Sequence, residues 1–158
     1  MIRLREGTEA DAGGLFELDR ICFDVGIAYS LREFRLLLRS RKTVCILAED
    51  GDDLAGFAIA QIAVLGESRG GHIVTIDVAP DFRRRGVGRL LMEQIEERMM
   101  AIGADWLRLE VAVNNTAASG FYRGLGFAAI GRIPDYYRGS VDATVMEKTL
   151  AKASASIH

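Results

Sequence analysis

Val78-Ala79-Pro80-Asp81-Phe82-Arg83-Arg84-Arg85-Gly86-Val87-Gly88-Arg89 joins a predicted strand to a predicted helix through a basic turn. The apolar run that precedes it, Ile73 to Val78, is typical of a strand, and the residues after it are amphipathic at helical spacing. Its two glycines allow the main chain to bend tightly, so that several N–H groups and the positive end of the helix converge. Such a point binds anions, and a diphosphate is the expected ligand. We therefore predict a site for a phosphorylated cofactor.

The bulk composition indicates one ordinary globular unit. A chain of 158 residues is long enough to bury its own core, and we predict a single domain over residues 1–150 with a loose tail over 151–158. The net charge of −2 makes the three consecutive arginines a local feature and argues against nucleic acid as a partner. The start lacks the apolar run of a signal peptide, and no segment approaches the ~20 apolar residues of a membrane span. We expect a cytoplasmic protein without a membrane partner, either monomer or homodimer.

The cysteines and histidines do not suggest a metal site. Cys22 and Cys45 lie in apolar runs without the spacing of a zinc ligand pair, and the chain has only two histidines. Two buried, reduced thiols and no metal are the prediction.

The remaining pattern alternates strands with helices and predicts an α/β fold with a mixed sheet. Capping-box patterns at Thr8 and Ser30 each open a predicted helix, and the apolar positions of the first include Leu15, Leu18, Ile21 and Cys22. A hairpin is predicted from two strands around the turn 50–53, and a loop containing Gly66, Gly70 and Gly71 is predicted to follow it. Gly103 closes the helix that begins after Gly88. The other predicted elements are strands over 2–5, 43–49, 54–64, 106–113, 127–133 and 141–149, and a short helix over 115–124.

Two rival phosphate-binding patterns do not fit the turn. The dinucleotide fingerprint requires a third glycine where this chain has Leu91, and no Walker sequence ending in Lys-Ser or Lys-Thr is present. The arrangement Arg83-x-x-Gly86-x-Gly88 after a strand instead resembles the acetyl-CoA pyrophosphate motif of the GNAT superfamily of N-acetyltransferases. A second motif of that superfamily, N-x-x-A-x-x-x-Y-x-x-x-G-F, is matched by Asn115-Thr116-Ala117-Ala118-Ser119-Gly120-Phe121-Tyr122-Arg123-Gly124-Leu125-Gly126-Phe127.

Within that superfamily, the chain looks like the ribosomal-protein alanine (RimI-type) N-terminal acetyltransferases. The resemblance rests on Leu107-Arg108-Leu109-Glu110-Val111, on Tyr136-Tyr137 and on Asp142-Ala143-x-x-Met146. The segment Ala28-Tyr29-Ser30 departs from the Pro-Trp-Ser that the subfamily usually has there. Because this segment belongs to the acceptor side, the departure concerns the peptide substrate and leaves the cofactor unaffected.

The resemblance implies a mixed, mostly antiparallel sheet that splays at the cofactor site and is flanked by helices. It implies acetyl-CoA as co-substrate, with the pyrophosphate on the turn and the pantetheine on backbone groups of the splayed strand. The amide of Asn115 is implied to contact the cofactor as well, beside its simpler role as a helix N-cap. The predicted cofactor-binding residues are Ile76, Asp77, Val78, Arg83, Arg84, Arg85, Gly86, Val87, Gly88, Arg89, Asn115 and Tyr122.

Two residues are predicted to be catalytic. Tyr122 is the candidate general acid for the departing thiolate, since phenol and thiol have comparable reference pKa values of about 10 and 8.5; its alternative role is that of an aromatic anchor. Glu110, a carboxylate within an apolar strand, is by resemblance the general base, acting through water, with Asp77 as the second candidate. Tyr136 and Tyr137 are expected to form one wall of the acceptor groove.

Three functions remain open from the sequence. The first is an acetyl-CoA-dependent N-acetyltransferase for the N-terminal α-amine of a protein or peptide, acting by direct attack. The second is an acetyltransferase for a small amine or amino-acid derivative, suggested by the departure at Ala28-Tyr29-Ser30. The third is a non-catalytic acyl-CoA-binding domain, against which the presence of Glu110 and Tyr122 argues.

Overall fold

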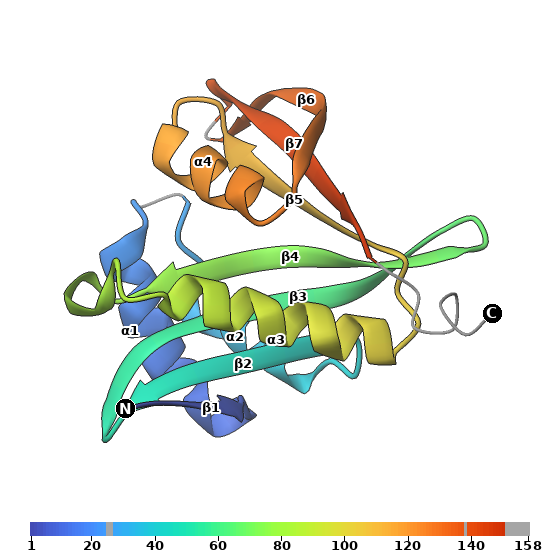
Figure 1. Cartoon of the computed structure of the whole chain (residues 1–158). Helices are drawn as coiled ribbons and strands as arrows, with labels where there is room; N and C mark the ends of the chain where they lie inside the picture. The colour runs from blue at the N-terminus through green and yellow to red at the C-terminus, as the bar shows by residue number, and fades with distance from the viewer. Residues whose placement is uncertain (25–26, 138, 151–158) are drawn as a thin grey trace.

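The protein is described by a computed structural model that covers residues 1–24, 27–137 and 139–150. It contains one seven-stranded sheet in the order β1-β2-β3-β4-β5-β7-β6 (Figure 1). Neighbouring strands are antiparallel except for β4 and β5, which run parallel. This confirms the predicted mixed, mostly antiparallel sheet. The strands are β1 (Ile2–Glu6), β2 (Thr43–Asp50), β3 (Asp53–Leu65), β4 (Ser68–Val78), β5 (Trp106–Ala112), β6 (Ala128–Tyr137) and β7 (Val141–Thr149).

The helices begin where the local sequence predicts. Thr8 forms a capping box with Asp11 at the start of a short 3-10 turn, which continues into α1 (Ala12–Cys22). Ser30 forms the same arrangement with Glu33 and opens α2 (Leu31–Arg39). The two remaining helices are α3 (Val87–Ala101) and α4 (Thr116–Gly124).

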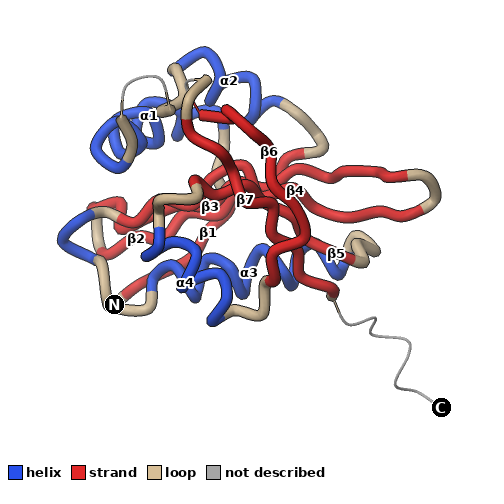
Figure 2. The backbone as a smooth tube through the Cα atoms, turned by 90° about the horizontal axis from the view of Figure 1, so that it is seen from above, coloured by secondary structure: helices blue, strands red, loops and turns tan. Residues whose placement is uncertain are grey.

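Helices cover both faces of the sheet, and each face has its own core (Figure 2). On one face α3 packs across β2, β3 and β4 and buries Leu91, Ile95 and Met99 completely. On the other face α1 and α2 pack through Leu15 and Phe34, which are equally inaccessible to solvent. Because helices cover both faces of β3, the residues in the middle of this strand are continuously apolar.

β4 and β5 stay paired over a very short distance. Their register joins Gly71 to Leu107 and His72 to Arg108, and the pairing ends there. From His72 onward the two strands separate, and in Figure 1 β5, β6, β7 and α4 form a group apart from β1–β4. The splay implied by the sequence resemblance is therefore present, and it opens the sheet between β4 and β5.

Three local predictions were wrong. Gly70 and Gly71 lie inside β4, not in a loop. A Cβ at Gly70 would lie 2.1 Å from the Trp106 ring, so glycine is needed there for close packing. β6 continues through Pro134 to Tyr137, which an edge strand permits because its outer N–H groups need no partner. Ile21, predicted to face the core, is 65% exposed.

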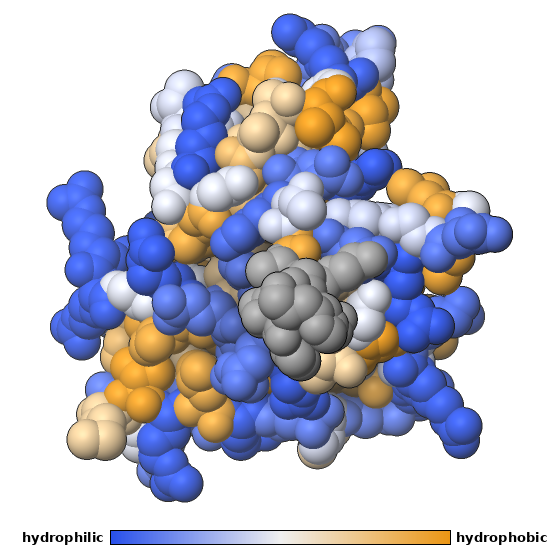
Figure 3. Space-filling view, turned by 45° about the vertical axis from the view of Figure 1, so that its right-hand side comes forward, coloured by the Kyte–Doolittle hydropathy of each residue, from blue (hydrophilic) through white to orange (hydrophobic). Residues whose placement is uncertain are grey.

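The predicted tail over 151–158 lies outside the described residues, and the single domain over 1–150 stays a prediction. Among the helices that the structure describes, none has both the length and the apolar character to cross a bilayer. The face drawn in Figure 3 is largely hydrophilic and is interrupted by separate apolar patches. The two cysteines are free thiols, and Cys45 is buried, as predicted. The prediction that Cys22 is also buried was wrong: it is half-buried, because it ends α1 and lines a cavity.

Candidate active site

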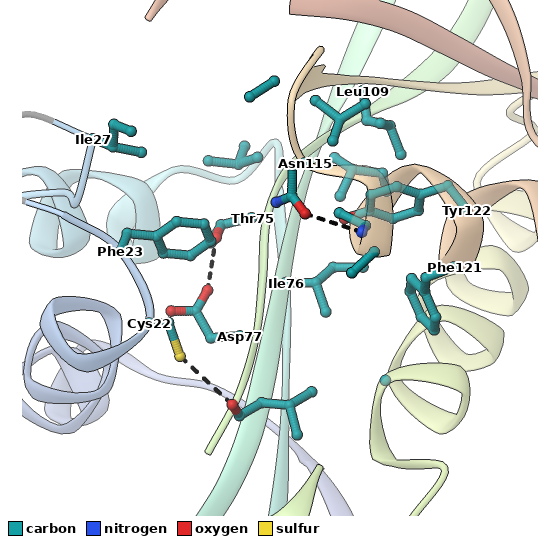
Figure 4. Close-up of a pocket in the computed structure, with 18 of the residues that line it drawn as sticks. Cys22, Phe23, Ile27, Thr75, Ile76, Asp77, Leu109, Asn115, Phe121 and Tyr122 are labelled. Carbon is teal, nitrogen blue, oxygen red and sulfur yellow. Dashed lines mark hydrogen bonds between the residues drawn. The ribbon is translucent and has the colours of Figure 1, made fainter. Parts of the chain in front are cut away.

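A cavity of about 1090 Å³ occupies the space that the splayed strands leave open. It runs from the N-terminus of α3, along β4, to the part of β5 that carries Glu110. The close-up in Figure 4 shows Ile76 on the side of β4 that faces Phe121 and Tyr122, while Thr75 and Asp77 point to the opposite side. The alternation is that of a regular strand, so β4 separates two different chemical environments.

The N-terminus of α3 presents unpaired main-chain donors to this cavity. Gly86 is the N-cap in a left-handed conformation, with φ 79°, and the first intrahelical bond runs from the N–H of Leu90 to the carbonyl of Gly86. The N–H groups of Val87, Gly88 and Arg89 precede that bond and have no partner within the helix. A Cβ at Gly86 would meet nothing within 4 Å, which leaves open space for a ligand. These donors lie where the sequence predicts an anion site, and that site stays a prediction.

The predicted arginines are exposed, and two of them already have partners. Nε of Arg83 donates to the carbonyl of Val78 at 3.1 Å, and the Arg85 guanidinium lies 5.2 Å from the Phe82 ring centroid. Arg83, Arg84 and Arg89 line the cavity, whereas Arg85 is not among its lining residues. Arg84 has φ 64°, an unusual backbone conformation for a non-glycine residue that helps shape the turn.

The separated edge of β4 contains the three residues predicted to contact a cofactor through their backbone. Ile76, Asp77 and Val78 all lie beyond the last pair with β5 and line the cavity. The carbonyl of Val78, however, already accepts from Arg83 and from Sγ of Cys22, the latter at 3.6 Å (Figure 4). The sequence contained no indication of this contact with Cys22, which comes from α1.

Asp77 is paired with a second buried carboxyl, that of Asp19 on α1. Both residues are fully buried, and they are close enough for a hydrogen bond between their side chains. Oδ1 of Asp77 accepts from Thr75 at 2.6 Å, and Oδ2 of Asp19 accepts from the N–H of Tyr29 at 2.7 Å. Oδ2 of Asp77 and Oδ1 of Asp19 have no other partner, and one shared proton satisfies both.

Burial and the neighbouring Asp19 raise the pKa of Asp77 to about 9. The carboxyl is therefore protonated at neutral pH and carries no negative charge with which to attract a proton. This makes Asp77 a poor candidate for the base and leaves Glu110 as the better one.

Tyr122 projects from α4 into an aromatic cluster beside the cavity. Its ring makes edge contacts with Phe121 and Phe127, at centroid distances of 5.3 and 5.7 Å. Burial, with a smaller effect of Asp77, raises the pKa of Tyr122 to about 12. The phenol thus stays protonated at neutral pH and can donate a hydrogen bond into the cavity. Its packing also fits the simpler role of an anchor for α4, so the geometry is compatible with both readings.

Asn115 is the N-cap of α4, as one of its two predicted roles requires. Its Oδ1 accepts from the N–H of Ala118 at 3.1 Å. The side-chain NH2 group takes no part in this cap, so its hydrogens can be donated to another partner. Asn115 also lines the cavity. The side chain can therefore cap the helix and donate to a ligand at the same time.

Glu110 lies at the far end of the cavity within a polar cluster. Its Oε1 lies 2.7 Å from Nε2 of His72 and accepts from the hydroxyl of Tyr136 at 3.3 Å. The hydroxyl of Tyr137 donates to the Glu110 carbonyl at 3.2 Å. Burial alone raises the pKa of Glu110, but the hydrogen bonds and charge of His72 and Tyr136 outweigh it and leave the pKa lowered. The predicted wall of Tyr136 and Tyr137 is thus next to Glu110.

His72 was not among the residues that the sequence singled out. It is a lone histidine in a strand and belongs to none of the recognised motifs, so no local pattern marked it. In the described part of the chain, no three His, Cys, Asp or Glu side chains gather in a way that could hold a metal ion.

Comparison with known proteins places this geometry in context. The sequence model described as "Acetyltransferase (GNAT) family" matches residues 14–127, which is more than half of the chain. The [ribosomal protein bS18]-alanine N-acetyltransferase of Salmonella typhimurium is 40% identical over 60% of this chain and 64% of its own length. An amino-acid acetyltransferase of Azotobacter vinelandii is 34% identical over 94% of this chain, but only 34% of its own length. The chain thus covers less than two thirds of either relative.

A solved structure shows the same fold. The crystal structure of Arabidopsis thaliana NAA60 in complex with acetyl-CoA aligns with a TM-score of 0.83, covering 94% of this chain and 98% of that one. The sequence identity is 21%, so this likeness concerns the fold alone.

Proposed function

This chain belongs to the GNAT acetyltransferase family, and on that premise we propose that it transfers an acetyl group from acetyl-CoA to the N-terminal α-amine of a protein or peptide. The observation that carries the proposal is the single cavity that links the free N–H groups of α3 to the Glu110 carboxylate. Acetyl-CoA, when bound, supplies a thioester whose acetyl group can pass to an amine with release of a thiolate.

The residues along the cavity fit such a ligand. The unpaired N–H groups of Val87, Gly88 and Arg89 suit a pyrophosphate, because they form a compact set of donors at the positive end of a helix. Arg84 and Arg89 line the same space and add positive charge. The edge of β4 beyond its last pair with β5 offers main-chain groups around Ile76 for the amides of the pantetheine arm and for the thioester oxygen.

Two side chains are proposed for the proton movements. Tyr122 donates a hydrogen bond from its hydroxyl to the departing sulfur. Glu110 is the anion that attracts the acceptor's ammonium group to the place where it loses its proton. The Glu110 carboxylate accepts a hydrogen bond from Tyr136, and its main-chain carbonyl accepts one from Tyr137. An α-amine with a pKa near 8 is about a tenth neutral at pH 7, so the demand on the base is modest.

The surroundings of Glu110 favour a peptide as acceptor. A second cavity of about 370 Å³ adjoins the first, and the two share Tyr29, Glu33, His72 and Val74. This extra space can accommodate residues that follow the acceptor's first one. The Salmonella relative, by its name, acts on an alanine of a ribosomal protein.

A small amino acid is the second candidate acceptor, because the Azotobacter relative is an amino-acid acetyltransferase. One assay separates the candidates: purified protein and acetyl-CoA with peptides of varied first residue, the same peptides with blocked N-termini and an internal lysine, and free amino acids. We expect mass spectrometry to find acetylation of free peptide N-termini. Acetylation of amino acids alone would favour the second candidate, and cofactor binding with no turnover would favour a non-catalytic domain.

A further inference from the structure

His72 occupies the position where β4 and β5 part. It is the last residue of β4 that pairs with β5, opposite Arg108. Its Nε2 lies 2.7 Å from Oε1 of Glu110, a residue 38 positions later in the chain. The His72 side chain is 38% exposed and the Glu110 side chain 17% exposed, and His72 lines both cavities. His72 therefore connects the proposed reaction site to a second opening.

Glu110, in contact with His72 and Tyr136, holds a proton only weakly. Burial raises its pKa, but the contacts with His72 and Tyr136 lower it overall, below its ordinary value. An α-ammonium group has a pKa near 8. A carboxylate with a lowered pKa is therefore better suited to hold and orient a cationic partner than to keep a proton taken from that amine.

The ring of His72 is better suited to accept the proton. A carboxylate only accepts hydrogen bonds, so the 2.7 Å contact requires the hydrogen on Nε2 of His72 and leaves the lone pair of the neutral ring on Nδ1. Histidine is the side chain whose ordinary charge change falls between about pH 5 and 8. A carboxylate that fixes the tautomer of a neighbouring imidazole and stabilises its charged form is a recurrent arrangement in hydrolases.

We propose that His72 is the catalytic proton acceptor of this site and that Glu110 is its positioning residue. This inference rests on the proposed acetyl transfer. An N–H bond of the acceptor ammonium breaks, its electron pair stays on nitrogen for the attack, and a new N–H bond forms at Nδ1 of His72. As the C–N bond forms and the C–S bond breaks, the second proton of that nitrogen passes to the departing sulfur. The imidazolium remains paired with the Glu110 carboxylate and then releases a proton to solvent through the second cavity.

The groups around His72 come from every element that borders it. Besides Glu110, β5 contributes Arg108, whose Nε is paired with Glu147 at 2.7 Å and therefore does not compete for the Glu110 carboxylate. The remaining titratable neighbours that line the two cavities are Tyr29, Glu33, Tyr136 and Tyr137.

The first test is the variant His72→Gln, which keeps an N–H donor within reach of Glu110 but removes the titratable ring. We expect kcat for a peptide acceptor to fall by about 10²-fold at pH 7, with an unchanged KM for acetyl-CoA. The deficit should shrink about fivefold between pH 7 and pH 8, because the amine then loses its proton without help. His158→Gln, which removes the chain's other histidine, serves as the matched control and should retain the wild-type profile.

A loss that is constant across pH, or no loss, would overturn the role of His72 while leaving the proposed function intact. A wild-type protein without any acetyl transfer would instead overturn the proposed function itself.

The second test does not depend on turnover. The chain has two histidines, so ¹⁵N-detected ring signals of the ligand-free protein can be assigned with His72→Gln alone. We expect neutral His72 to carry its hydrogen on Nε2 and Glu110→Gln to move its ring ¹⁵N signals. A hydrogen on Nδ1, or ring signals that stay unchanged in Glu110→Gln, would contradict the pairing on which the inference depends.

Discussion

At the scale of single residues, Tyr122 shows how burial changes the chemistry expected from reference values. Reference pKa values place phenol and thiol within about two units, but burial raises the pKa of Tyr122 to about 12. Burial disfavours every anion, so it also raises the pKa of a thiol that leaves into the same cavity. The two groups therefore remain comparable, and the hydroxyl can still stabilise a departing sulfur.

The variant Tyr122→Phe tests this role. It keeps the aromatic contacts with Phe121 and Phe127 but removes the hydroxyl. We expect kcat for acetyl transfer to fall by about 10²-fold, while the Kd for acetyl-CoA from calorimetry stays close to that of the wild type. Unchanged kcat would mean that the ring is only an anchor for α4.

At the scale of elements, the short pairing of β4 with β5 depends on two glycines that the sequence analysis predicted to lie in a loop. Gly70 and Gly71 suggested a loop, yet neither has a left-handed backbone conformation, and both lie in β4. They are needed because Trp106, Leu107 and Met99 pack directly on the strand. The Trp106 ring is held in place by a 2.7 Å hydrogen bond from Nε1 to Ser68, so it cannot move away easily.

Substitution of Gly70 tests this packing. A Cβ there would lie 2.1 Å from the Trp106 ring, and we expect Gly70→Ala to lower the free energy of unfolding by about 1–3 kcal/mol. Gly131→Ala in β6 is the control, because the nearest atom to its Cβ is 4.0 Å away. Trp106 is the chain's only tryptophan, so its fluorescence during urea unfolding reports the transition directly. Equal stability of the two variants would contradict the packing argument.

At the scale of the whole molecule, the Asp19–Asp77 pair connects one helical layer to the sheet. Asp19 belongs to α1 and also accepts from the N–H of Tyr29, which lines the cavity. Asp77 belongs to β4, a strand that lines the same cavity. The shared proton therefore links α1 and the Tyr29 segment to the splayed strand.

This pair predicts a specific pH dependence of stability. Because the pKa of Asp77 is raised to about 9 in the folded chain, the folded state binds more protons than the unfolded state above about pH 4. The contribution of the Asp77 proton to the stability of the folded chain is therefore fully present below about pH 4, and it is lost as the pH rises toward 9. Urea unfolding midpoints should show Asp77→Asn to be the more stable protein near pH 9, with a flatter profile than the wild type. The control Asp52→Asn, in an exposed turn, should follow the wild type; parallel curves for all three would exclude the shared proton.

The sequence alone was enough for the features that depend on neighbouring residues. The capping boxes at Thr8 and Ser30, the hairpin around residues 50–53 and the tight bend at Gly86 before α3 are local, since each needs only a few adjacent residues to form. The family resemblance added the mixed, mostly antiparallel sheet and its splay, and both are present in the structure.

Only the tertiary structure decided which distant side chains meet. His72 and Glu110 lie on different strands, and Asp19 and Asp77 lie on a helix and a strand that are far apart in the chain. Which side chains face each other across such elements depends on strand register and helix packing, and neither leaves a local trace in the sequence. The same holds for Gly70, whose need for a glycine comes from the Trp106 ring and not from its own backbone conformation.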